Sequence, residues 1–150
     1  MTTFRTAVFV FVIVFVAYAI NMFTVPANGK VFYTVYYMLY AVAMGGINSA
    51  GTNLIYDFVE PNKRVAALAL QHTLAGFAGF FATIIVGFLV DYIQKSGNMF
   101  LGMNVYAQQV VSAIGATVVL LALLYLNTVV KKMQREREAE KAAAAIVDAE

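Results

Sequence analysis

The sequence predicts an all-α membrane protein, a polytopic bundle of four transmembrane helices with both termini in the cytoplasm. Hydrophobic residues make up 62% of the 150 residues, whereas roughly 45–50% is typical of soluble domains. They gather in four stretches, each near the roughly 20 residues that a helix needs to cross a bilayer. Within a four-span region of residues 1–130, the predicted spans cover about 7–23, 31–56, 65–90 and 105–130, and residues 131–150 form a charged, Ala-rich cytoplasmic tail.

The basic residues set the predicted orientation, because Lys and Arg beside a span are retained on the cytoplasmic side. Arg5 precedes the first stretch, and Lys63 and Arg64 separate the second from the third. The other two connections hold one cation each, Lys30 and Lys95. The remaining cations follow the fourth stretch: Lys131, Lys132, Arg135, Arg137 and Lys141. An even number of spans in a cell membrane (plasma or inner), with both ends inside, satisfies this bias at every connection.

The first stretch, residues 7–23, is apolar nearly all round. In hydrocarbon a helix pairs its own backbone groups and a lone strand does not, so we predict a lipid-facing support helix. A cleavable signal peptide is the alternative, because Arg5, an apolar run and the small residues Ala17 and Ala19 resemble its three-part pattern. The apolar run continues past Ala19, and this favours a span.

The second stretch carries polar residues on one face. With successive residues placed about 100° apart, six of them fall within one arc of roughly 140°: Gly45, Asn48, Ser49, Thr52, Asn53 and Tyr56, the polar arc. Polar side chains in hydrocarbon need partners. The polar arc therefore either lines a water-filled cavity or holds the bundle together through interhelical hydrogen bonds.

Tyr37 borders the arc toward the outer end. Tyr33, Tyr36 and Tyr40 lie on the adjoining face, and for Tyr33 and Tyr36 an aromatic belt at the outer interface is the favoured interpretation.

The third stretch places small residues on one face, at Gly76, Gly79, Thr83 and Gly87, the glycine face. Small residues let helix backbones approach closely in a membrane, so we predict that the glycine face packs against another helix. His72, the single histidine, lies on the same face near the cytoplasmic end. It is either a proton-relay residue or a packing histidine hydrogen-bonded to Gln71 or another neighbour.

The fourth stretch is mostly aliphatic, with Gln108, Gln109 and Ser112 near its outer end. Beyond it, Lys132 and Glu136 have the four-residue spacing of a helical ion pair. Between the second and third stretches we predict a short charged turn, with Pro61 beginning the next helix. The outer connection, residues 91–104, is predicted to be an irregular loop.

The composition argues against several classes of function. A net charge of +2 that is accounted for by membrane orientation leaves no basic face for nucleic acid. The absence of cysteine excludes disulfides and thiolate chemistry. One histidine and almost no intramembrane carboxylate supply no convergent catalytic set, so we expect neither an enzyme nor a cofactor or metal. A small multidrug exporter has the same number of spans, but its essential acidic residue in the first span has no equivalent, because no acidic residue precedes Asp57.

The order of an apolar, a polar-faced, a glycine-faced and another apolar helix resembles the end of a major facilitator superfamily transporter, helices nine to twelve. The resemblance is best from Gly46 to Thr128, in "GINSAGTNLIYDFVEPNKRVAALALQHTLAGFAGFFATIIVGFLVDYIQ" and in "GNMFLGMNVYAQQVVSAI". It implies that the second span lines the cavity, that the third packs at the junction of two halves, and that the first and fourth lie at the periphery.

The resemblance further implies a C-terminal fragment of a secondary active transporter that moves a small solute by alternating access, coupled to H⁺ or Na⁺. Such transport requires two halves, so the missing N-terminal half and the lipid bilayer are the expected partners. The implied substrate-binding residues are Tyr37, Gly45, Asn48 and Thr52. The alternative is a self-contained four-span structural or assembly protein that forms homo-oligomers through the glycine face.

Overall fold

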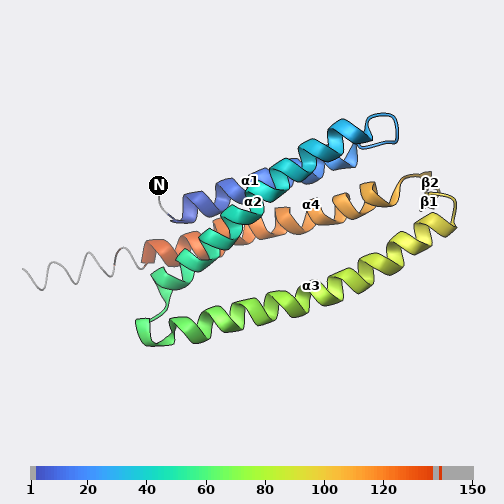
Figure 1. The fold of residues 1–150 in the computed structure, drawn as a ribbon. Coiled ribbons are helices and arrows are strands. Elements are labelled where there is room, and N and C mark those ends of the chain that lie inside the picture. Colours follow the sequence, from blue (N-terminus) through green and yellow to red (C-terminus); the bar gives the residue numbers. More distant parts are fainter. Residues whose placement is uncertain (1–2, 137–138, 140–150) are drawn as a thin grey trace, which may run out of the picture.

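The computed structural model describes residues 3–136 and residue 139 of the chain. The described part is mostly helical, and it confirms the all-α prediction (Figure 1). Its four long helices are α1 (Thr3–Met22), α2 (Gly29–Phe58), α3 (Arg64–Lys95) and α4 (Ala107–Tyr125). A 3-10 turn, Pro61–Lys63, precedes α3, and a π-helical turn, Leu126–Val130, continues α4.

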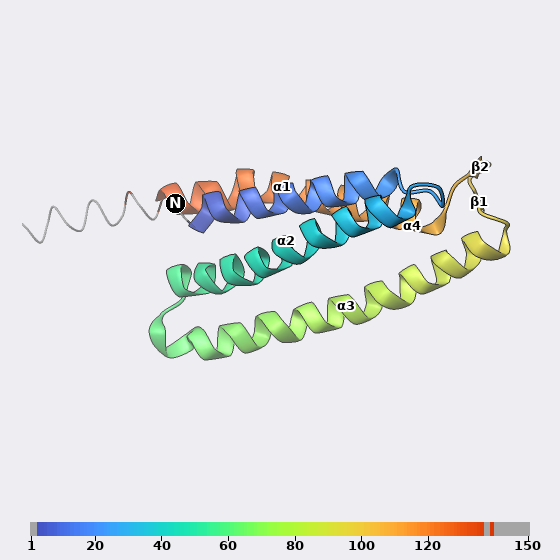
Figure 2. The same cartoon turned by 45° about the horizontal axis from the view of Figure 1, so that its top comes forward.

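Consecutive helices run in opposite directions (Figure 1). The start of α1, the turn between α2 and α3, and the last turns of α4 therefore lie at one end of the molecule, and the other two connections lie at the opposite end. Both Figure 1 and Figure 2 show α1, α2 and α4 side by side, with α3 apart from them along most of its length.

Three helical segments of the described chain are long and apolar enough to cross a membrane: Phe4–Met22, Pro61–Lys95 and Ala107–Glu136. An 18-residue window within each segment has a mean hydropathy of 2.0, 2.2 and 2.2, respectively. The fourth helix, α2, is long enough at 30 residues, but its tyrosines and asparagines lower its hydropathy. The structure thus supports a membrane protein with three candidate spans, and a crossing by α2 stays a prediction.

The core lies around α1, which packs against both α2 and α4. Val10 and Val14 of α1 are buried with Ala43 of α2 and Val119 of α4. Ala7, Val10, Val14 and Ala17 follow one another at spacings of three and four residues, so they share one face of the helix. The expectation that α1 faces lipid all round is therefore wrong for this face, because its small and branched side chains fit against two neighbouring helices.

Two glycines allow these helices to approach closely. A Cβ atom added to Gly46 of α2 would lie 2.6 Å from Cγ2 of Val10, and one added to Gly115 of α4 would lie 2.7 Å from Cζ of Tyr18. A larger residue at Gly46 requires the Val10 side chain to move, and one at Gly115 requires the Tyr18 side chain to move. The close approaches to side chains of α1 thus lie at Gly46 and Gly115, and the glycine face of α3 has no such contact.

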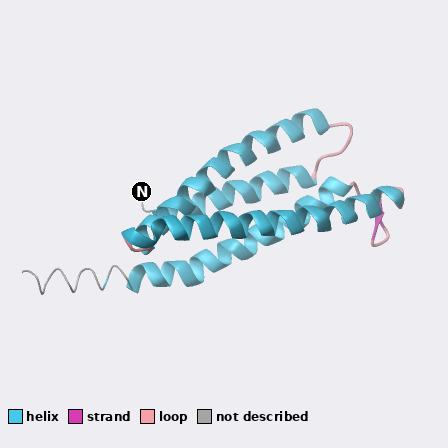
Figure 3. Cartoon of the chain, turned by 60° about the horizontal axis from the view of Figure 1, so that its bottom comes forward, coloured by secondary structure: helices cyan, strands magenta, loops and turns pink. Residues whose placement is uncertain are grey.

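The connection between α3 and α4 is more regular than predicted. α3 continues to Lys95, whose Nζ forms an ion pair of 2.7 Å with Asp91 one turn earlier, and this pairing favours the additional turn of helix. Beyond it, β1 (Met99–Phe100) and β2 (Met103–Asn104) pair as an antiparallel hairpin, drawn in magenta in Figure 3. The prediction of an irregular loop over residues 91–104 is therefore wrong.

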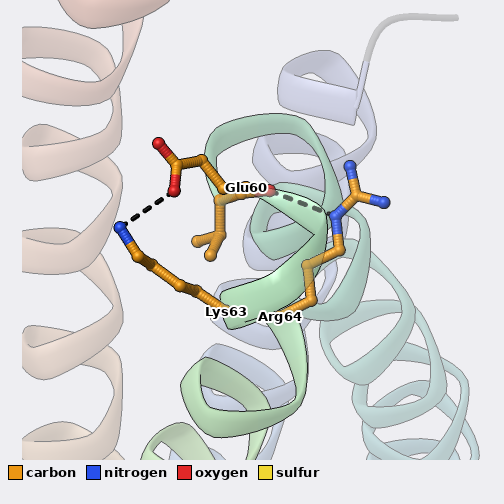
Figure 4. A network of polar contacts seen from close by, with 4 residues as sticks. Glu60, Lys63 and Arg64 are labelled. Atoms are coloured by element: carbon orange, nitrogen blue, oxygen red, sulfur yellow. Dashed lines mark hydrogen bonds and ion pairs between the residues drawn. The ribbon is translucent and has the colours of Figure 1, made fainter.

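The turn between α2 and α3 begins a helix at Pro61, as predicted. Arg64 donates from Nε to the Val59 carbonyl at 3.1 Å and from a terminal nitrogen to the Tyr56 carbonyl at 2.9 Å. Its guanidinium also lies 4.9 Å from the centre of the Tyr56 ring. Lys63 pairs with Glu60 at 2.8 Å (Figure 4). Arg64 thus satisfies carbonyls that the end of α2 leaves without helical partners.

Candidate functional site

The face of α2 that packs against α1 is distinct from the polar arc. Ala43 and Ala50 are buried, Ile47 packs against the core, and Gly46 meets Val10. The spacings of three and four residues between these positions define one apolar stripe. The opposite side of α2, which carries the polar arc, is left uncovered by α1 and α4.

The residues of the polar arc are accessible in this structure. Gly45, Asn48, Ser49, Asn53 and Tyr56 are exposed, and Thr52 is partly buried. The Thr52 hydroxyl donates to the Asn48 carbonyl of its own helix at 3.0 Å. Within residues 3–136, no side chain of Asn48, Ser49, Thr52 or Asn53 makes a hydrogen bond to another helix. The polar arc therefore does not hold the described bundle together.

The structure brings three of the four candidate substrate-binding residues together. Gly45, Asn48 and Thr52 follow one another within two turns of α2, and no atom of another described helix lies within 4 Å of the place where a Cβ of Gly45 would be. Tyr37 precedes Gly45 by eight positions, roughly 12 Å along the axis. It is 57% exposed and contacts Tyr33 and Tyr36. These four residues thus trace a path along α2 rather than enclose a single pocket.

Tyr37 belongs to a larger aromatic cluster that the sequence showed only in part. The rings of Tyr36 and Tyr40 stack with their centres 5.6 Å apart, and Tyr18 of α1 lies 6.0 Å from each. Tyr18 was not singled out, because nothing in a sequence indicates which face of α1 meets α2. The cluster joins α1 to the N-terminal half of α2, and the interfacial belt at Tyr33 and Tyr36 stays a prediction.

The glycine face of α3 is open. No atom of another described helix lies within 4 Å of the place where a Cβ of Gly76, Gly79 or Gly87 would be, and the Thr83 hydroxyl donates to the Gly79 carbonyl of its own helix at 2.8 Å. Shallow hollows follow this face. One is lined by His72, Thr73, Gly76, Phe77 and Phe80, and another by Thr83, Ile84, Gly87, Phe88 and Asp91. The predicted packing partner of this face is not among the described helices.

His72 and Gln71 lie on different sides of α3. His72 is exposed in its hollow, whereas the Gln71 side chain approaches α2, where a Cβ added to Gly51 would lie 2.8 Å from its Nε2. No hydrogen bond joins these two residues in the described chain. The proton-relay role of His72 stays a prediction.

A buried polar cluster joins α1 to α4 near the α1–α2 and α3–α4 connections. Asn21 Nδ2 donates to Ser112 Oγ at 2.7 Å, and the Thr24 hydroxyl donates to Asn21 Oδ1 at 3.1 Å. Gln109 Nε2 donates to the Thr24 carbonyl at 3.2 Å. The sequence indicated Gln109 and Ser112 but not Asn21 or Thr24, which lie 91 and 85 residues from their α4 partners. The available signal in the sequence was spacing: Asn21 and Thr24 lie three residues apart, and so do Gln109 and Ser112.

Comparison of the chain with protein-family models, with curated proteins and with solved structures finds no match. The fold and the exposed apolar surface define its class. Its described part is helical, with three helices suited to cross a membrane, a polar arc on a fourth helix, and an open glycine face.

Proposed function

We propose that this chain is the C-terminal portion of a secondary active transporter of the major facilitator type. All four helices then cross the cell membrane, both termini lie in the cytoplasm, and α2 lines part of the path of a small solute. The observation that carries this proposal is the uncovered polar arc of α2, beside an apolar stripe that packs on α1.

Asparagine side chains are costly in hydrocarbon unless their amide groups find partners. Asn48 and Asn53 are exposed, and α1, α3 and α4 provide no hydrogen bond to their side chains among the described residues. In a membrane, this side of α2 therefore requires protein or water from outside the described bundle. Further helices around a water-filled path, as in the two halves of an alternating-access transporter, meet that requirement.

The arrangement of the helices also fits the proposed orientation. The turn that contains Lys63 and Arg64 lies at the same end of the molecule as the start of α1 and the last turns of α4 (Figure 1). These are the segments beside Arg5 and beside Lys131 and Lys132. A cytoplasmic location for this end agrees with the retention of cations inside the cell.

In this proposal Asn48 offers the solute both a donor and an acceptor. Thr52 offers an oxygen lone pair, because its hydroxyl hydrogen is already used by the Asn48 carbonyl. Gly45 leaves room for the solute, and Tyr37 presents an aromatic face farther along the path. His72, exposed on α3, is the candidate relay for a coupled proton.

The test compares uptake by the complete transporter with and without the polar side chains, at equal membrane abundance. Asn48→Ala and Thr52→Ala are expected to reduce uptake by about tenfold each, the effect of losing roughly 1.4 kcal/mol of solute interaction. Thr117→Ala is the matched control, because the Thr117 hydroxyl makes the same bond to a carbonyl of its own helix, that of Ala113 at 2.9 Å. Normal uptake in both arc variants rules out the cavity assignment.

A homo-oligomeric four-span assembly protein is the second candidate, and the open glycine face favours it. Gly79→Ile is then expected to dissociate the oligomer. Ala78→Ile is the matched control, because Ala78 is also exposed but lies roughly 100° away around α3. Cross-linking of the purified chain distinguishes the cases, since in the transporter case Gly79→Ile disrupts assembly with the N-terminal half instead.

A further inference from the structure

The hairpin between α3 and α4 turns through a residue that such turns disfavour. Leu101 and Gly102 connect β1 to β2 and have positive φ angles of 50° and 78°. Two-residue hairpin loops with positive φ at both positions favour Asn, Asp or Gly at the first position. Leucine has no side-chain oxygen to stabilise this conformation, so local turn chemistry does not account for Leu101.

The same leucine is among the most exposed large side chains of the described chain. Leu101 is 82% exposed, and Met103 and Met99 beside it are 57% and 46% exposed. These three side chains form the apolar tip of the hairpin. Backbone strain and side-chain exposure thus occur together at Leu101. Burial of the tip in an apolar medium would offset the free-energy cost of exposing these apolar side chains to water.

The apolar tip is held in a defined position. The Asn98 amide donates to the Ile93 carbonyl at 2.9 Å, and the Val105 amide donates to the Asn98 carbonyl at 2.8 Å. Ile93 is fully buried, so the base of the hairpin is fixed to the end of α3. The tip is consequently presented at a constant height relative to that helix.

The neighbouring sequence indicates what covers the tip. The membrane-crossing candidate Pro61–Lys95 ends four residues before β1, and no charged residue occurs from Ser96 to Val130. An uncharged apolar segment tethered this close to a span suits the boundary between headgroups and acyl chains. We propose that the tip Met99–Met103 is an interfacial anchor that inserts into the outer leaflet of the bilayer and fixes the height of α3 and α4.

This inference rests on the membrane crossing in the proposed function, and the experiment separates the two. The chain contains no tryptophan, so a single introduced indole reports its own surroundings. Met103→Trp marks the tip, Phe80→Trp marks the middle of α3, where Phe80 is exposed, and Asn62→Trp marks the charged turn at the other end. Each variant is reconstituted in vesicles of phosphatidylcholine brominated either near the headgroup or near the chain end.

For an anchor, Met103→Trp emits at shorter wavelength than Asn62→Trp and is quenched more by bromine near the headgroup than near the chain end. Emission like that of Asn62→Trp, with Phe80→Trp still quenched, overturns the anchor and leaves the crossing intact. A shift to the blue without lipid quenching means that protein covers the tip, and it also overturns the anchor. If Phe80→Trp is unquenched and also emits at the long wavelength of Asn62→Trp, the crossing itself fails and the anchor with it.

A second substitution tests Leu101 without disturbing the hairpin. Asparagine is favoured at this turn position, so Leu101→Asn preserves the fold and removes only the apolar side chain. Combined with Met103→Trp, it is expected to move the emission to the red and to reduce quenching by lipid. If the emission and quenching of Met103→Trp remain unchanged, Leu101 does not anchor the tip.

Discussion

The helices α1 and α3 are similarly apolar, but they pack in opposite ways. Within an 18-residue window of each candidate span, the mean hydropathies are 2.0 and 2.2, and 28% of the α1 window is buried, against none of the α3 window. The buried Ile93 lies near the end of α3, outside that window. Hydrophobicity therefore does not decide which helix lies in the core. In a membrane, close packing between helices decides which helix lies in the core, because lipid solvates apolar side chains as well as another helix would.

The positions of the glycines explain this difference. α1 meets Gly46 of α2 and Gly115 of α4, and each lets its backbone approach an α1 side chain. α3 carries its own glycines at Gly76, Gly79 and Gly87, and no described helix approaches them. The core thus forms where the glycines of one helix face larger side chains of another. The glycine face of α3 lacks such a partner within this chain.

The largest effect is expected from filling one of the close approaches. Gly46→Ile places a branched side chain where even a Cβ lies 2.6 Å from Val10 Cγ2, and overpacking of this kind costs about 1–3 kcal/mol. Gly79→Ile is the matched variant in open space, with an expected change in the unfolding free energy of the monomer close to zero. Unfolding in mixed micelles measures both. Equal losses would contradict the division between a packed α1 and an open α3.

The helical periodicity of the sequence was sufficient to predict part of this packing. The alternation of apolar stretches with basic connections gave the four helices, and the 100° periodicity placed Asn48, Ser49 and Asn53 on the face of α2 that the structure leaves uncovered. Helical periodicity cannot identify which helices pack against each other, however. It marked Gly76 and Gly79 as a packing face and missed Gly46 and Gly115, because spacing shows which residues share a face and not which helix covers it.

Two further features could not be predicted, for separate reasons. The hairpin at Met99–Asn104 has no Asn-Gly or Asp-Gly signal at its turn, since Leu101 occupies the position that such turns give to asparagine. The bond between Asn21 and Ser112 joins residues 91 positions apart. A single sequence contains no record of that contact, even though both residues are conspicuous as polar groups in apolar surroundings.

An intermediate effect is expected from the buried polar cluster that joins α1 to α4. Asn21→Ala leaves the hydroxyls of Ser112 and Thr24 without their partner, at a cost of about 1–2 kcal/mol in unfolding free energy. Asn127→Ala is the control, because Asn127 is exposed and its amide bonds only to the Leu123 carbonyl of its own helix. The same unfolding assay measures both variants. A loss no larger than that of Asn127→Ala would mean that apolar packing alone holds α4 to α1.

The smallest effect is expected at the turn that joins α3 to the rest of the chain. Arg64→Ala removes two hydrogen bonds to the end of α2 and the contact with the Tyr56 ring, and in this partly exposed place we expect a loss of about 0.5–1 kcal/mol. The loss should be local, since the core around α1 does not involve this turn. Faster hydrogen exchange in the last turn of α2, with unchanged exchange in α1, is therefore the expected signature. Lys63→Ala breaks only the exposed pair with Glu60, so it should leave hydrogen exchange unchanged both in the last turn of α2 and in α1. If Arg64→Ala instead loosens α1, then α3 contributes to the core through this turn, and the contrast between the two helices is smaller than their burial indicates.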